Sequence, residues 1–200
     1  MSSPSPPPVL RVAQIVLGVL ALTGLLLAGL GALLPRRWHV QESVMINAPP
    51  AAIHAWVNDL HHWPKWAQWN QSDLAPKNQL SGPSGGTGAR LTWYGRGGDS
   101  PASGEVRIVK SDPALGVWFE NHTSGGEPSR AEITYVARPG VTEVIWKDEG
   151  QLPPIVGGMF LDLFQKRLSR HMAAGLERLK ELVELGGKVD PRVVPNSEEP

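Results

Sequence analysis

The chain has 200 residues, with 19 basic and 19 acidic side chains and no cysteine. The balanced charge, without a basic cluster interleaved with aromatic residues, argues against nucleic-acid binding. The absence of cysteine excludes disulfides, thiol catalysis and cysteine metal sites. Eight tryptophans stand against two tyrosines and three phenylalanines, and two interpretations of them are open: they fill a core, or they line an apolar cavity.

The N-terminal segment combines a tail with an apolar run. Residues 1–11 are rich in serine and proline and are expected to form a disordered tail. Residues 12–34 carry no charge and are long enough to span a bilayer of roughly 30 Å, so we predict a transmembrane helix. Trp38 then follows at the position of an interfacial aromatic residue. A cleaved signal peptide is the competing interpretation, but the run is longer than usual and lacks a good cleavage site.

This prediction implies a single-pass membrane protein whose anchor places the rest of the chain beside the bilayer. Arg36 and Arg37 after the run outnumber Arg11 before it, which slightly favours a cytoplasmic C-terminal domain. The free amino terminus nearly cancels this difference, so the side of the membrane stays open.

Residues 38–185 are expected to form one domain. A strand at residues 39–47 shows alternating apolar side chains and is followed at Pro50 by a helix with one apolar face. A short helix or turn follows at residues 63–69. Further strands are predicted at residues 89–95, 104–110, 116–123, 131–138 and 141–149. Short turn signals separate these strands, which indicates an antiparallel meander.

The chain is organised around a long helix predicted at residues 155–185. Apolar residues three or four positions apart form one stripe along it: Leu161, Phe164, Leu168, Met172, Leu176, Leu179 and Val183. Such a helix needs a large apolar partner, and we expect one curved sheet wrapped over it. Residues 186–200 are expected to form a disordered acidic tail.

Several motifs lie in a characteristic order: Ile46-Asn47-Ala48-Pro49-Pro50, Ile53-His54-Ala55-Trp56, Trp63 through Trp69, Ser81-Gly82-Pro83, Val141-Thr142-Glu143-Val144-Ile145-Trp146, and Gly175-Leu176. With these motifs, residues 40–183 resemble the START-like, polyketide cyclase/dehydrase-type ligand-binding proteins of the SRPBCC superfamily. The resemblance implies an α+β helix-grip fold, in which a curved antiparallel sheet surrounds the C-terminal helix. It also implies a pocket for a small apolar or lipid-like molecule between them.

Strand alternation and the long helix together give the candidate residues of the pocket wall. Trp66 and Trp69 are expected to close one mouth of the pocket. Trp118 and Phe119 face opposite ways, and which of them points inward stays open. The other candidates are Trp93, Tyr135, Val144, Trp146, Asp148, Phe160 and Phe164.

No catalytic constellation stands out, and we assign no catalytic residue, metal or cofactor. Asp148 and Glu149 have two interpretations: a buried carboxylate that could act as acid or base, or a solvated strand end. His61 and His62 are adjacent and point in different directions on a helix, so they are a poor metal pair. The glycines at residues 85–88 lack the Walker lysine, and the absence of Gly-x-Ser-x-Gly disfavours a hydrolase.

Three functions fit the sequence. The first is a membrane-anchored protein that binds a small apolar or lipid-like ligand in the pocket. The second is a polyketide cyclase or dehydratase acting in the same pocket, with Asp148, Tyr135 and His122 as its only available polar groups. The third is an interaction module whose pocket has closed. Whether the protein is an enzyme therefore stays open.

Overall fold

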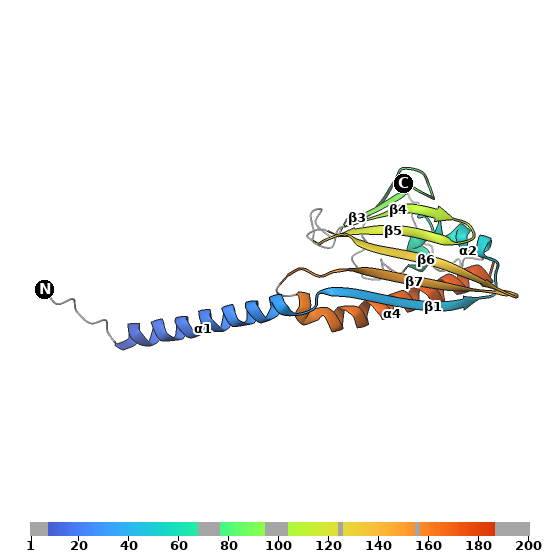
Figure 1. The fold of residues 1–200 in the computed structure, drawn as a ribbon. Coiled ribbons are helices and arrows are strands. Elements are labelled where there is room, and N and C mark those ends of the chain that lie inside the picture. The colour runs from blue at the N-terminus through green and yellow to red at the C-terminus, as the bar shows by residue number, and fades with distance from the viewer. Residues whose placement is uncertain (1–7, 68–76, 95–103, 124–125, 155–156, 187–200) are drawn as a thin grey trace, which may run out of the picture.

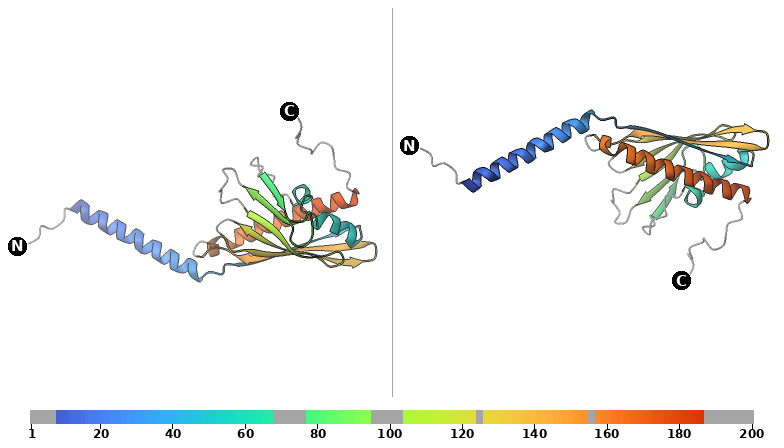
Figure 2. Two further views of the ribbon diagram at one scale, coloured as in Figure 1. Left: turned by 90° about the horizontal axis from the view of Figure 1, so that it is seen from above. Right: turned by 90° about the horizontal axis from the view of Figure 1, so that it is seen from below.

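The computed structural model describes residues 8–67, 77–94, 104–123, 126–154 and 157–186. Within these ranges, three helices lie on one face of a single antiparallel sheet, and a fourth projects away from it (Figures 1 and 2). The helices are α1 (Pro8–Leu33), α2 (Pro50–Val57), α3 (Trp63–Trp66) and α4 (Gly157–Glu184). The strands are β1 (Arg37–Ile46), β2 (Lys77–Ser81), β3 (Arg90–Tyr94), β4 (Gly104–Asp112), β5 (Gly116–Thr123), β6 (Ser129–Arg138) and β7 (Val141–Gln151).

The described strands follow the order β1-β7-β6-β5-β4-β3-β2, and every neighbouring pair is antiparallel. Strands β2 to β7 form a meander, and β1 pairs with β7, so the first and last strands of the chain lie side by side. In this pairing Val40 lies opposite Asp148. The α+β class, the antiparallel sheet and the long C-terminal helix are therefore confirmed.

Strand β2 was not predicted from the sequence. Its five residues read Lys-Asn-Gln-Leu-Ser and contain one apolar side chain, Leu80, so no alternation marks them as a strand. The strand lies at the edge of the sheet, where one side has no neighbouring strand. Backbone pairing with β3 therefore defines β2, and Leu80 packs at the border of the core.

The predicted apolar stripe of α4 faces the sheet, but the two halves of the helix pack differently. Its C-terminal half is buried through residues that include Met172, Leu176 and Leu179, whereas Phe164 and Leu168 in the N-terminal half are only partly buried. Gly175 marks a close approach, because a Cβ atom there would lie 3.2 Å from the Trp146 ring. The N-terminal half therefore lies less closely against the sheet than the C-terminal half.

The predictions of a transmembrane helix and of a single-pass membrane location are wrong. Helix α1 begins at Pro8, inside the predicted tail, and its described side chains are mostly exposed. Yet none of the helices in the described part of the chain is long and apolar enough to cross a membrane. Most of the two predicted disordered tails, residues 1–7 and 187–200, lies outside the described residues.

The unequal packing of α4 gives a prediction for stability. Leu176 is 1% exposed, whereas Leu163 on the same helix is 62% exposed. Leu176→Ala should lower the free energy of unfolding by about 2–4 kcal/mol, because it removes buried methyl groups and leaves a cavity. Leu163→Ala is the matched control and should change it by less than about 0.5 kcal/mol. Urea unfolding of the two variants measures this, and equal losses would contradict the described packing.

Candidate functional site

A cavity of about 470 Å³ lies between the sheet and the N-terminal half of α4. This volume falls within the range of small-molecule sites, roughly 300–1,000 Å³. Its wall combines four large aromatic side chains, three aliphatic residues and seven residues with polar or charged side chains. The lining residues are Trp38, Trp93, Asn121, Thr123, Gly126, Glu127, Ser129, Trp146, Asp148, Gln151, Leu152, Pro153, Phe164, Leu168 and His171.

Each of the three tryptophans in the wall lies against a glycine. Trp38 of β1 covers Gly150 of β7, and Trp93 of β3 covers Gly104 of β4, so a Cβ atom at either glycine would collide with the ring. The Trp146 ring lies against Gly175 of α4. A larger side chain at these glycines would require the rings to move, so the glycines allow the tryptophans to take the positions that form the wall.

Asp148 is the buried acid of the cavity. It is 6% exposed, and its Oδ1 atom accepts a hydrogen bond from Trp38 Nε1 at 2.9 Å, while Oδ2 accepts one from Asn121 Nδ2 at 3.1 Å. Burial raises the pKa of Asp148 to about 6, although hydrogen bonds from Trp38, Ser129 and Asn121 stabilise the ionised form. Of the two interpretations of this acid, the buried carboxylate is the one that the structure shows.

Three further polar atoms around the cavity are buried and have no hydrogen-bond partner among the described residues. They are Trp146 Nε1, His171 Nε2 and Asn121 Oδ1. Burial, together with the positive charge of Arg167, lowers the pKa of His171, so its imidazole is neutral near pH 7. An unsatisfied buried polar atom costs on the order of 1–3 kcal/mol, which a bound partner would offset.

Four of the nine predicted site residues line this cavity: Trp93, Trp146, Asp148 and Phe164. Trp66 and Val144 are buried within the packed core, where the Trp66 ring lies 5.8 Å from the Trp146 ring. Phe160 is exposed on α4, and Trp69 lies outside the described residues. Phe119, not Trp118, points into the core, and Trp118 donates to Glu132 Oε2 at 2.7 Å.

Tyr135 does not line the cavity, although it faces the same side of the sheet. Its hydroxyl lies 3.4 Å from Nδ1 of the buried His54 on α2, and His54 Nε2 lies 3.2 Å from Ser111 Oγ. Burial raises the pKa of Tyr135 and lowers that of His54, so both are neutral near pH 7. This chain of contacts joins α2 to β4 and β6.

The sequence analysis missed several residues of the wall, above all Trp38, Asn121, Ser129 and His171. Strand alternation contained the signal for three of them. Trp38 shares its parity with Val40, Asn121 with Phe119 and Ser129 with Ala131, so each points toward the core side. Assigning Trp38 to a membrane interface concealed this parity.

His122 faces away from the cavity. It lines a second, more polar groove of about 480 Å³ together with outward-facing charged residues, which are Arg37, Glu120, Glu127, Arg130 and Glu149. His122 Nε2 lies 3.4 Å from Glu120 Oε2, and Glu120 also accepts from Arg107 at 2.7 Å. The outer groove therefore carries charges of both signs that partly neutralise each other.

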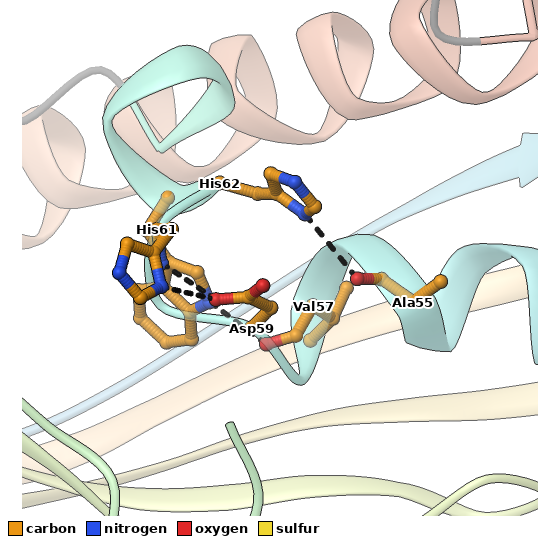
Figure 3. A network of polar contacts seen from close by, with 6 residues as sticks. Ala55, Val57, Asp59, His61 and His62 are labelled. Carbon is orange, nitrogen blue, oxygen red and sulfur yellow. Dashed lines mark hydrogen bonds and ion pairs between the residues drawn. The ribbon is translucent and has the colours of Figure 1, made fainter. Parts of the chain in front are cut away.

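The adjacent histidines His61 and His62 have separate roles in the turn between α2 and α3 (Figure 3). The backbone N and the ring Nδ1 of His61 contact Asp59 Oδ1 at 2.9 and 2.8 Å. His62 Nδ1 instead lies 3.3 Å from Ala55 O. The described residues contain no group of three or more potential metal ligands, and these two histidines stabilise the turn.

The raised pKa of Asp148 gives a prediction about pH. An unfolded aspartate titrates near pH 3.9, so between about pH 4 and 6 the folded protein holds a proton that the unfolded chain has lost. Asp148 therefore lowers stability as pH rises through this window, and Asp148→Asn removes the effect. The stability of the variant relative to the parent should rise by about 2–3 kcal/mol from pH 4 to pH 7.

Urea unfolding of the variant and the parent at each pH measures this difference in stability. Both proteins contain His54 and His171, so the titrations of these two residues cancel in the difference. Glu177→Gln is the matched control, because Glu177 is an exposed carboxylate on α4, whereas the charge of Glu149 contributes to the raised pKa of Asp148. Its stability relative to the parent should change by less than about 0.5 kcal/mol across the same range. A flat profile for Asp148→Asn would show that Asp148 is solvated.

Solved structures with this fold include proteins of different kinds. Norcoclaurine synthase from Thalictrum flavum, in complex with dopamine and hydroxybenzaldehyde, has a TM-score of 0.57 at 14% identity, covering 80% of this chain and 94% of its own. A Staphylococcus aureus protein of unknown function also has a TM-score of 0.57, at 9% identity, with coverages of 75% and 96%. The KanY protein has a TM-score of 0.55 at 21% identity, with coverages of 74% and 98%.

These identities are low, so the structural likenesses establish the fold alone. No curated protein sequence matches the chain significantly. The sequence model of the family described as "Polyketide cyclase / dehydrase and lipid transport" matches residues 37–184, which span β1 to the end of α4. The chain therefore belongs to the polyketide cyclase/dehydrase and lipid transport family.

Proposed function

We propose that the protein binds a small, largely apolar ligand in the cavity between the sheet and the N-terminal half of α4. The observation that carries the proposal is the cavity itself, about 470 Å³ in volume and walled by Trp38, Trp93, Trp146 and Phe164. Flat aromatic walls with a few polar groups are typical of small-molecule sites. The membership of the family, whose description names lipid transport, supports the same function.

The polar atoms of the cavity support a ligand over a merely empty space. Trp146 is 2% exposed, and its Nε1 atom is a donor without a partner among the described residues. His171 Nε2 is buried nearby without a partner, at the opposite wall formed by α4. A ligand with an oxygen acceptor would satisfy the indole, and its apolar body would cover the aromatic rings.

The first test fills the cavity with a side chain. Leu168 lies in the cavity wall, so Leu168→Trp should occupy part of the volume and weaken the binding of an apolar ligand. We expect Nile red, a neutral apolar dye, to bind the full-length protein with saturable fluorescence enhancement. In Leu168→Trp the dissociation constant should rise at least about tenfold, equivalent to about 1.4 kcal/mol.

Leu163→Trp is the matched control, because Leu163 lies on the same helix but on its exposed side. This variant should bind Nile red as the parent does. Non-saturable dye binding, or equal affinities for the parent and Leu168→Trp, would contradict a binding cavity at this place. A circular dichroism spectrum of each variant verifies that the helix and sheet are retained.

A second candidate function is a cyclase or dehydratase that acts in the same cavity. Asp148 favours it, since a carboxyl group with a pKa of about 6 is suited to donate or accept a proton near neutral pH. Of the three polar groups available from the sequence, Tyr135 and His122 lie away from the cavity wall. Turnover of a polyketide-like substrate that disappears in Asp148→Asn, with Nile red affinity retained, would establish an enzyme.

A further inference from the structure

The cavity wall has an uneven charge. Its described lining residues include the buried carboxylate of Asp148 and, at the rim shared with the outer groove, the exposed carboxylate of Glu127, but no lysine or arginine. The remaining titratable side chain of the wall, His171, is neutral near pH 7 because burial and Arg167 lower its pKa. A ligand that reaches the inner end of the cavity therefore meets the negative charge of a buried carboxylate, Asp148.

Basic side chains close to the cavity bind groups other than Asp148. Arg36 lies behind the wall, where its guanidinium donates to Leu152 O at 3.2 Å and to the side-chain oxygen of Gln151 at 2.7 Å. Lys147, next to Asp148 in sequence, pairs with Glu132 Oε1 at 2.9 Å on the outer face. Arg167 lies on the exposed side of α4. Asp148 is thus held by neutral donors, and its charge is not cancelled by a cation of the described chain.

The hydrogen-bond acceptors of Asp148 and Asn121 can accept further hydrogen bonds. The Asp148 carboxylate accepts hydrogen bonds from Trp38, Asn121 and Ser129, and its two oxygens together can accept about four. Asn121 Oδ1 lies on the same amide that contacts Asp148, and it is buried with no donor among the described residues. Beside Asp148 and Asn121 Oδ1 the described residues therefore leave acceptor capacity unfilled and place no cation, and an ammonium group supplies both donors and positive charge; the Trp146 indole donor remains available to an oxygen atom on the body of the same ligand.

The aromatic rings around this carboxylate are suited to the same group. Trp38, which donates to Asp148, packs against Phe164 with ring centroids 4.8 Å apart. Trp93 and Trp146 complete the aromatic part of the wall. The faces of such rings attract cations, most strongly in the case of tryptophan.

We propose that the ligand of this cavity is an organic cation, a protonated amine on an aromatic or other apolar body. Its ammonium group binds Asp148 and Asn121 Oδ1, and its apolar body lies among Trp38, Trp93, Trp146 and Phe164. This inference rests on the proposed binding function. It excludes carboxylate ligands such as fatty acids, because a second negative charge beside Asp148 is unfavourable in an apolar site.

The test compares three compounds with the same ring and different charge: naphthylmethylamine, methylnaphthalene and naphthoate. Each competes with Nile red for the full-length protein at about pH 7.5, where Asp148 and naphthoate are ionised and the amine is protonated. We expect the amine to displace the dye at a concentration at least about tenfold lower than the neutral compound. Naphthoate should be the weakest of the three.

Two variants then identify the group responsible. Asp148→Asn should weaken binding of naphthylmethylamine at least about tenfold and leave methylnaphthalene within about twofold. Glu177→Gln is the matched control, since it removes an exposed negative charge of α4 that does not line the cavity and should leave all three compounds unchanged.

The outcomes separate this inference from the function on which it rests. If Nile red binds and Leu168→Trp weakens it, but the amine is no better than methylnaphthalene, the cation inference is overturned and the binding function stands. If Nile red does not bind saturably, both fail. The affinities of the three compounds for the parent protein test the cation inference without the variant, so the test remains valid even if Asp148→Asn does not fold.

Discussion

The approach of α4 to the sheet determines the rest of the site. At Gly175 the helix comes close enough that a single added carbon would lie 3.2 Å from Trp146 and 3.4 Å from the backbone of Trp66. From Met172 onward the sheet-facing side chains are fully buried, and the aromatic rings of α3 fill the space beneath, with Trp63 and Phe119 centroids 4.9 Å apart. Before Met172 the described side chains pack less closely, and the cavity begins there.

Strand and helix periodicity explain why most of the fold could be predicted from the sequence. The apolar stripe from Leu161 to Val183 determines which face of α4 packs against the sheet. Alternation of apolar side chains determines which residues of β5 to β7 point toward the helix. Strand β2 carries no such pattern, because an edge strand with mostly polar residues is held by backbone pairing. The apolar run before residue 35 was interpreted as a membrane span on composition alone, and that interpretation did not hold.

The candidate site could be predicted only in part. Alternation shows on which face of the sheet a side chain lies, but it does not show whether that position along the strand is next to the cavity or within the packed core. Tyr135, Val144 and Asp148 share the inward face, yet Tyr135 and Val144 lie where α2 and the core cover them. Asp148 lies nearer the end of β7, beside Trp38 and Asn121. These contacts join residues 27 to 110 positions apart, and no local pattern reports such a distance.

Asp148 is poorly explained by folding alone. Its lateral neighbours on β1 and β6 are Val40 and Ala131, so an apolar side chain at this position would continue the core. Burial instead raises the pKa of the carboxyl group, which means that ionisation at neutral pH opposes folding. The donors from Trp38, Asn121 and Ser129 offset only part of this cost. Residues that weaken a fold in this way are commonly retained for function, and here the carboxylate faces the cavity.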